Sequence, residues 1–133
     1  MLKIDTEVGL IKMSQCDELS TLRKIDRKLE ENTKYTIFEV NNNYFSFRKA
    51  GKTIEKMFSE NFSNAVKINL RNNDLDSKSV GKIIALMKNC ELLEELDLSD
   101  NRFNRKDKMR LTKAARKHPK LTLFLGANRL TRS

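Results

Sequence analysis

One short phrase recurs along this chain at a nearly constant interval, and it constrains the fold more than any other feature. Its clearest copy begins at Leu93 and reads LEELDLSDNRF, or LxxLxLxxNxF, with its asparagine at Asn101. The asparagine position returns 28 residues earlier at Asn73, another 30 residues earlier at Asn43, and 27 residues later at Asn128. Repetition at this period is typical of small structural units stacked side by side. We therefore expect a solenoid rather than a closed globule.

Each copy of the phrase predicts a short strand followed by a helix. Side chains alternate along a strand, so the apolar positions on one side of the phrase should face the core and the polar ones should face solvent. The asparagine then ends the strand, where its amide can satisfy backbone groups that the turn leaves unpaired. An apolar stripe at helical spacing follows within 79–88: Val80, Ile83, Ile84 and Met87. The next stripe is Leu111, Ala114, Ala115 and His118.

The first and last units should differ from the others, because terminal repeats must face water. The first unit follows the phrase weakly through Val8, Ile11, Met13 and Cys16, with cysteine in the asparagine position. We interpret residues 1–34 as an N-terminal capping coil or helix, 35–64, 65–92 and 93–119 as full repeats, and 120–133 as a terminal half-repeat. The 133 residues then form a single domain.

These phrases, in coils of 27–30 residues, resemble the ribonuclease-inhibitor-like class of leucine-rich repeats. The resemblance covers about residues 8–131 and is closest over 35–130, with Tyr35 and Ala65 replacing leucine at the first position. It implies an α/β solenoid, a horseshoe segment of four to five coils, with a parallel sheet on the concave side and helices on the convex side.

The same resemblance implies a function. Proteins of this class mostly bind other proteins, and some cover the active site of an enzyme. Short intracellular versions are similar to the leucine-rich-repeat effectors that pathogenic bacteria inject into host cells. The resemblance therefore implies a non-catalytic protein-binding module, either an effector or a regulator of one, whose partner is an enzyme or another effector.

Stacking would align equivalent positions of successive strands into rows roughly 4.8 Å apart on the concave face. The candidate protein-binding residues on this face are Ile37, Glu39, Asn41, Lys67, Asn69, Arg71, Glu94, Glu95, Asp97, Ser99 and Phe124. The signs of charge are mixed, which suits a protein partner better than a phosphate backbone, with Arg71 and Phe124 as candidate anchors. The structural alternative is that Lys67 and Glu95, on adjacent strands, pair only to support the sheet.

The net charge of +9 is concentrated at one end of the chain. Residues 102–133 hold 11 Lys and Arg residues and one acid, Asp107, whereas residues 1–101 hold 16 bases and 17 acids. The candidate basic patch is Arg102, Arg105, Lys106, Arg110, Lys113 and Lys117. The last four of these recur at helical spacing, and we place them on an outer face opposite the stripe of Leu111, Ala114 and Ala115. Nucleic acid or anionic membrane is the alternative partner, but no aromatic residue is interleaved for base stacking and no nucleic-acid motif is present.

We expect no catalysis, cofactor or metal. Cys90 and His118 lie in the same phase one coil apart, so they should be neighbours at successive helix ends. A thiol–imidazole pair is one interpretation. A small hydrophobe beside a capping histidine is the one we favour, because the negative end of a helix dipole raises a thiol pKa. Two cysteines and one histidine do not make a structural zinc site. There is no glycine-rich phosphate loop, and we attribute Gly51 and Gly81 to helix packing.

The sequence favours a cytoplasmic location. No apolar run approaches the roughly 20 residues of a membrane span, and the N-terminus lacks the apolar core of a secretory signal. Two cysteines provide no disulfide framework. The resemblance extends this expectation to a host-cell cytosol after translocation, with the chain monomeric on its own.

Overall fold

The computed structural model describes residues 2–5, 7–13, 27, 35–40 and 64–126, and every structural statement below concerns these residues. The strands are β1 (Leu2–Asp5), β2 (Leu10–Met13), β3 (Ile37–Glu39), β4 (Lys67–Asn69), β5 (Glu95–Asp97) and β6 (Thr122–Phe124). The helical elements are the short 3-10 helix η3 (Ser77–Ser79), α3 (Val80–Asn89) and α4 (Arg105–Arg116).

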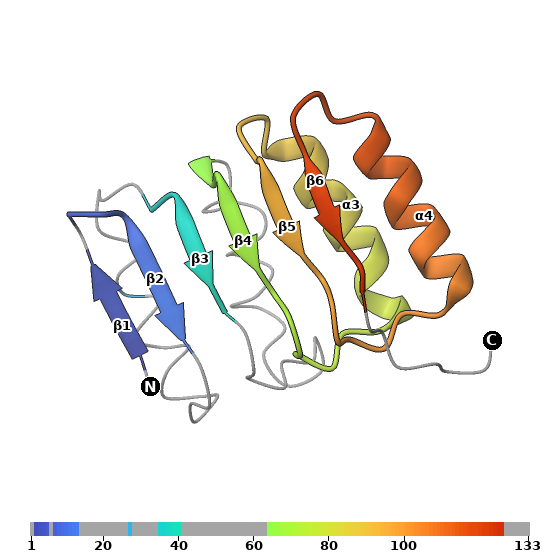
Figure 1. Cartoon of the computed structure of the whole chain (residues 1–133), viewed down its shortest axis with the longest axis horizontal. Helices are drawn as coiled ribbons and strands as arrows, with labels where there is room; N and C mark the ends of the chain where they lie inside the picture. Colours follow the sequence, from blue (N-terminus) through green and yellow to red (C-terminus); the bar gives the residue numbers. More distant parts are fainter. Residues whose placement is uncertain (1, 6, 14–26, 28–34, 41–63, 127–133) are drawn as a thin grey trace.

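All six strands form one sheet, ordered β1 to β6 as they occur in the chain (Figure 1). Strands β2 to β6 are parallel to their neighbours, and β1 is antiparallel to β2. Parallel neighbours require a crossover connection, and α3 and α4 supply it between β4, β5 and β6. Crossovers of one hand between consecutive strands place both helices on the same face of the sheet. The predicted α/β class with a largely parallel sheet is therefore confirmed.

The strand register repeats without a shift. Ile37 pairs with Lys67, Lys67 with Glu95, and Glu95 with Thr122, so residues one period apart are lateral neighbours. The rows expected from the sequence over β3 to β6 are thus confirmed. Strand β2 continues them, with Ile11 opposite Phe38, as the weak first phrase predicted.

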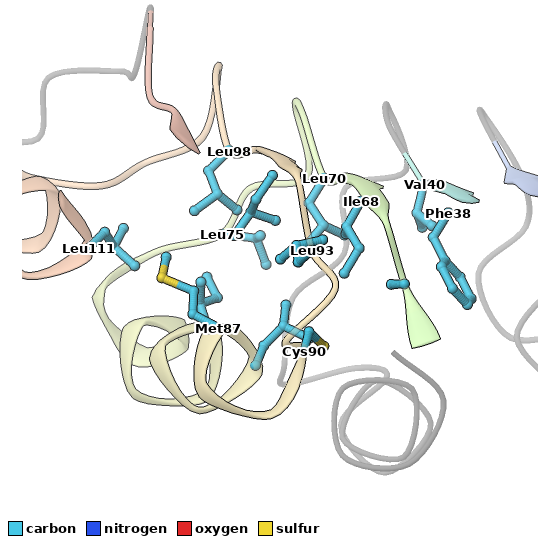
Figure 2. Close-up of a cluster of buried hydrophobic side chains, with 14 of the residues drawn as sticks. Phe38, Val40, Ile68, Leu70, Leu75, Met87, Cys90, Leu93, Leu98 and Leu111 are labelled. Carbon is cyan, nitrogen blue, oxygen red and sulfur yellow. The ribbon is translucent and has the colours of Figure 1, made fainter. Parts of the chain in front are cut away.

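The core lies between the sheet and the helices. One residue on the helix-facing side of each of four successive strands is fully buried: Ile11, Phe38, Ile68 and Leu96. Figure 2 shows Ile68 and Leu98 on the sheet side of the cluster and Met87 of α3 on the helix side. Each buried side chain of this size contributes about 1.5–3 kcal/mol relative to exposure, so stacking one unit on the next stabilises both.

The side chains of Asn73 and Asn101 connect successive units just after the strands, and we call this set of hydrogen bonds the amide ladder. The buried Asn101 side chain donates from Nδ2 to the Leu70 carbonyl at 3.0 Å, and its Oδ1 accepts from the backbone N–H groups of Asn73 at 2.9 Å and Leu75 at 3.0 Å. Asn73 repeats the motif one unit earlier by donating to the Val40 carbonyl at 2.6 Å. The predicted role of the asparagine is confirmed at both positions, and Asn43, Asn128 and Cys16 lie outside the described residues.

The N-terminal unit differs from the prediction. Sequence reasoning missed β1 and its hairpin with β2, because an antiparallel strand has no counterpart elsewhere in the repeat. The Asp5 carboxylate accepts from the N–H groups of Glu7 and Val8, and Gly9 adopts a φ of 75°, which closes the turn. Val8, expected at the first core position, is instead 59% exposed.

The structure of α3 differs from the sequence prediction in two details. Leu86 is buried in the stripe with Val80, Ile83 and Met87, whereas Ile84 is only partly buried. Gly81 was attributed to helix packing, but a Cβ at this position would meet no atom within 4 Å, so packing does not require glycine there. Gly51 lies outside the described residues.

Candidate functional site

The sheet face turned away from the helices presents two complete rows of side chains. The first row is Ile37, Lys67, Glu95 and Thr122. The second row is Glu39, Asn69, Asp97 and Phe124. All eight side chains are exposed or half-buried, while the residues between the rows on β3, β4 and β5 are fully buried. The alternation of a strand thus separates a core face from a solvent face, as the sequence predicted.

The first row lines a hollow of about 660 Å³ at the amino ends of β3 to β6. All four of its members contribute, and Val66, Glu94 and Lys120 complete the lining. The hollow therefore combines two acids, two bases and small apolar groups drawn from four units of the chain. Of the sequence-predicted site residues, it brings together Ile37, Lys67, Glu94 and Glu95.

Opposite charges on this face form lateral pairs between neighbouring strands. Lys67 Nζ lies 3.4 Å from Glu95 Oε2, and Lys12 Nζ lies 3.8 Å from Glu39 Oε2. The pair by which Lys67 and Glu95 were expected to support the sheet is therefore present in the structure. Exposed pairs of this kind contribute about 0.2–1 kcal/mol and are weakened by salt.

Two polar residues of the second row also fold their own chain. The side-chain oxygen of Asn69 accepts from the Arg71 N–H at 3.0 Å, and that of Asp97 accepts from the Ser99 N–H at 2.9 Å. Phe124, at the equivalent position of β6, cannot make this bond and is 45% exposed.

The other predicted residues of this face, Asn41, Arg71 and Ser99, occupy equivalent positions after the strands in the sequence, and of the two that the structure describes only Arg71 is exposed. Ser99 was placed on the binding face, but it is 9% exposed, because the chain turns inward toward Asn101 at this point. Arg71 remains exposed, and its guanidinium bonds to Asp100 of the next unit, which raises its pKa above the usual value. Asn41 lies outside the described residues.

The residues that precede the ladder asparagines adopt left-handed backbone conformations. Asn72 has a φ of 55° and Asp100 has a φ of 56°. Asparagine and aspartate tolerate this region better than other residues with a Cβ, which explains their presence at the same position of successive units.

The basic patch separates into two groups. Arg102 lies 3.5 Å from Asp74 and is paired, and Arg105 and Lys106 are exposed on the first turn of α4. Arg110, Lys113 and Lys117 line a groove between α3 and α4. We expected these three residues to lie opposite the apolar stripe. Instead, they share the groove with Ala114, because the flank of α4 that carries all four residues faces α3.

The only acid of the basic region is removed from the surface. Asp107 is 4% exposed, and its carboxylate accepts hydrogen bonds from the Asn104 N–H at 3.0 Å and from the Ser77 hydroxyl. The Asn104 side chain accepts in turn from the Asp107 N–H at 2.9 Å, which completes a capping box at the start of α4. Asp107 thus joins two units and leaves the exposed charge of α4 entirely positive.

Cys90 and His118 are neighbours, as predicted, but the imidazole contacts the backbone. His118 Nε2 donates to the Cys90 carbonyl oxygen at 2.8 Å, and Nδ1 accepts from the Lys120 N–H at 3.3 Å. Burial raises the pKa of the Cys90 thiol to about 12, so the thiol is protonated at neutral pH. His118 thus caps the backbone at Cys90, and the Cys90 thiol lies buried beside it. A protonated thiol is not the thiolate that nucleophilic catalysis needs.

Metal binding, membrane crossing and similarity to known proteins give no further indication of function. Within the described residues, no cluster of three or more His, Cys, Asp or Glu side chains could hold a metal ion. In the same residues, no helix combines the length and apolar character needed to cross a bilayer. No protein-family model matches the chain, and no curated protein matches it. The surfaces themselves must therefore carry the functional argument.

Proposed function

We propose that the chain is a leucine-rich-repeat solenoid of the ribonuclease-inhibitor-like class and that its open sheet face binds a protein partner without catalysis. Three features support the class. Five parallel strands repeat in one register, helices cover one face, and buried asparagines tie each unit to the one before it. Such stacks present extended surfaces built from one position of each unit.

The observation that carries the binding proposal is the hollow formed by the whole first row. Its residues come from rigid strands, so little conformational entropy is lost when a partner orders them. The face carries the exposed ring of Phe124, a residue type enriched at protein interfaces, and the charges of Lys67 and Glu95, which suit the polar rim of such an interface. A nucleic-acid backbone would require a single sign of charge.

The partner class follows from the resemblance stated for the sequence. We propose that the chain acts as an effector, or as a regulator of one, that binds an enzyme in a cytosol and covers its active site. A stack of this size with no thiolate and no metal cluster among its described residues would act by occlusion or sequestration. Lys67 and Glu95 can exchange their mutual pair for pairs with the partner, which favours specificity over raw affinity.

A charge reversal on the sheet tests this proposal. The partner is first identified by co-purification with the tagged chain from its source cell and by mass spectrometry. Its purified form is then titrated against the wild type and the double variant Glu95→Lys plus Asp97→Lys. We expect at least a tenfold loss of affinity, because like charges facing across an interface cost several kcal/mol.

Two controls make the result specific. Glu7→Lys reverses an exposed acid in the β1–β2 turn, away from both rows, and should leave the affinity within about twofold. Phe124→Ser removes the exposed ring without changing charge and should weaken binding if the ring is an anchor. Unchanged capture by the sheet double variant, with the fold intact by circular dichroism, would show that the sheet face is not the binding surface.

A further inference from the structure

The helix side of the molecule carries a second surface that the proposed function does not use. A groove of about 850 Å³ runs between α3 and α4. Its apolar residues are Ile84 and Met87 of α3, Leu92 of the loop after α3, Ala114 of α4, and Pro119 of the loop after α4. Leu92 is 52% exposed, which alone would be ordinary, but here it continues the apolar lining of the groove.

Basic side chains surround these apolar residues. Five cations line the groove, against the single carboxylate of Glu91: Lys88, Arg110, Lys113, Lys117 and Lys120. None of the five forms an ion pair with a carboxylate of the described residues. The one acid of α4, Asp107, is buried on the side of Ser77 and cannot neutralise them. The groove is thus apolar within and positive around its rim.

We propose that this groove binds a short acidic amphipathic helix of a partner protein. The apolar side of such a helix would cover Ile84, Leu92 and Ala114, and its carboxylates would pair with the basic rim. The stretch of α4 from Arg110 to its C-cap Lys117 extends for roughly 11 Å at 1.5 Å per residue. That length accommodates about two turns of a helix, which is the spacing of anchors at i, i+4 and i+7.

Two other anionic macromolecules fit the groove less well. Single-stranded nucleic acid binds by stacking successive bases on aromatic rings, and no Phe, Tyr or Trp is among the residues that line the groove. An anionic membrane favours a protruding cationic face, whereas the apolar residues here line a recess. The charge and the shape of the site together favour a protein segment.

The groove lies on the face opposite the two rows of the sheet, so one molecule could hold both partners. The inference is independent of the proposed function, because none of its apolar residues belongs to either row. Lys120 is the single residue that lines both the groove and the sheet hollow.

The test uses a fluorescein-labelled peptide with leucines at i, i+4 and i+7 and glutamates beside them, titrated with the full chain and followed by fluorescence anisotropy. We expect the double variant Lys113→Glu plus Lys117→Glu to lose at least tenfold in affinity. The matched control Arg105→Glu plus Lys106→Glu makes the same change of charge on exposed residues of α4 outside the groove, and should stay within about threefold.

A second variant separates the apolar contribution from charge. Leu92→Ser alters an exposed side chain without changing charge, and should weaken the peptide several-fold while circular dichroism stays unchanged. A peptide of the same composition whose leucines do not share one helical face should bind more weakly. Equal losses in both double variants, no effect of Leu92→Ser, or tighter binding of generic RNA or of phosphatidylserine vesicles than of the peptide would each overturn the proposal.

Discussion

The two faces of the molecule differ in how their charges are paired. On the sheet, Lys67 faces Glu95 across adjacent strands, and Arg71 bonds to Asp100 of the next unit. On the helix side, Arg110 and Lys113 line a groove without a carboxylate partner among the described residues. Paired charges would make the binding that we propose for the sheet face selective, because a partner would have to replace existing contacts. The charges of the groove have no such contact within the described part of the chain, so the acidic partner that we propose would not have to displace one.

Both faces rest on the same buried asparagine hydrogen bonds between successive units. We expect Asn101→Ala to lower the free energy of unfolding by about 3 kcal/mol, because it leaves the buried N–H groups of Asn73 and Leu75 without their acceptor. Urea unfolding provides the measurement. The control Asn69→Ala removes one exposed side-chain bond and should cost about 1 kcal/mol or less. Equal costs would mean that the ladder does not hold the units in register.

Between the two faces, the core should keep the Cys90 thiol inert. In a Cys16→Ser background, we expect iodoacetamide to modify Cys90 slowly in the folded protein and rapidly in urea, because burial disfavours the thiolate. The folded pKa of about 12 lies above the ordinary thiol value of 9.0, so the stability linked to this group is present below pH 9 and is lost as pH rises toward 12. Cys90→Ala should remove that part of the pH dependence. Rapid modification of the native protein would restore the thiol–imidazole interpretation.

The smallest expected effects compare the two faces directly. Lys67→Gln should lower the free energy of unfolding by about 0.2–1 kcal/mol, because it breaks a cross-strand pair. Arg110→Gln should raise it by about 0.2–0.5 kcal/mol, because it relieves repulsion from Lys106 and Lys113 at helical spacing. Both changes should shrink in high salt. Thermal melts at two salt concentrations measure them, and effects of the same sign would remove the distinction between the faces.

Much of the sheet was predictable because it is set by one repeated interval. Once Asn73 and Asn101 are placed at equivalent positions, Lys67 and Glu95 must be neighbours, and each strand's alternation assigns the face. The hairpin of β1 was not predictable in this way, since it depends on local turn chemistry at Asp5 and Gly9 that no other unit repeats.

The groove was the part of the candidate sites that the sequence could not reveal. A helical stripe defines which side of α3 is buried only to within a neighbouring position, and Ile84 and Leu86 lie at its two margins. Which of the two side chains is more buried depends on how α3 packs beside α4, and the sequence of α3 alone does not determine that packing. The nearest available signals were the apolar Leu92 between helix and strand and the spacing of Arg110, Lys113 and Lys117.

The left-handed turn at Asp100 has an evolutionary consequence. Glycine adopts this backbone region more easily than aspartate, so Asp100→Gly would preserve the turn while removing the carboxylate that holds Arg71. A single replacement would therefore release a restrained guanidinium toward solvent without straining the folded backbone of the turn. If the sheet binds a partner as we propose, its specificity would diversify at such turn positions while the architecture beneath them stays constant.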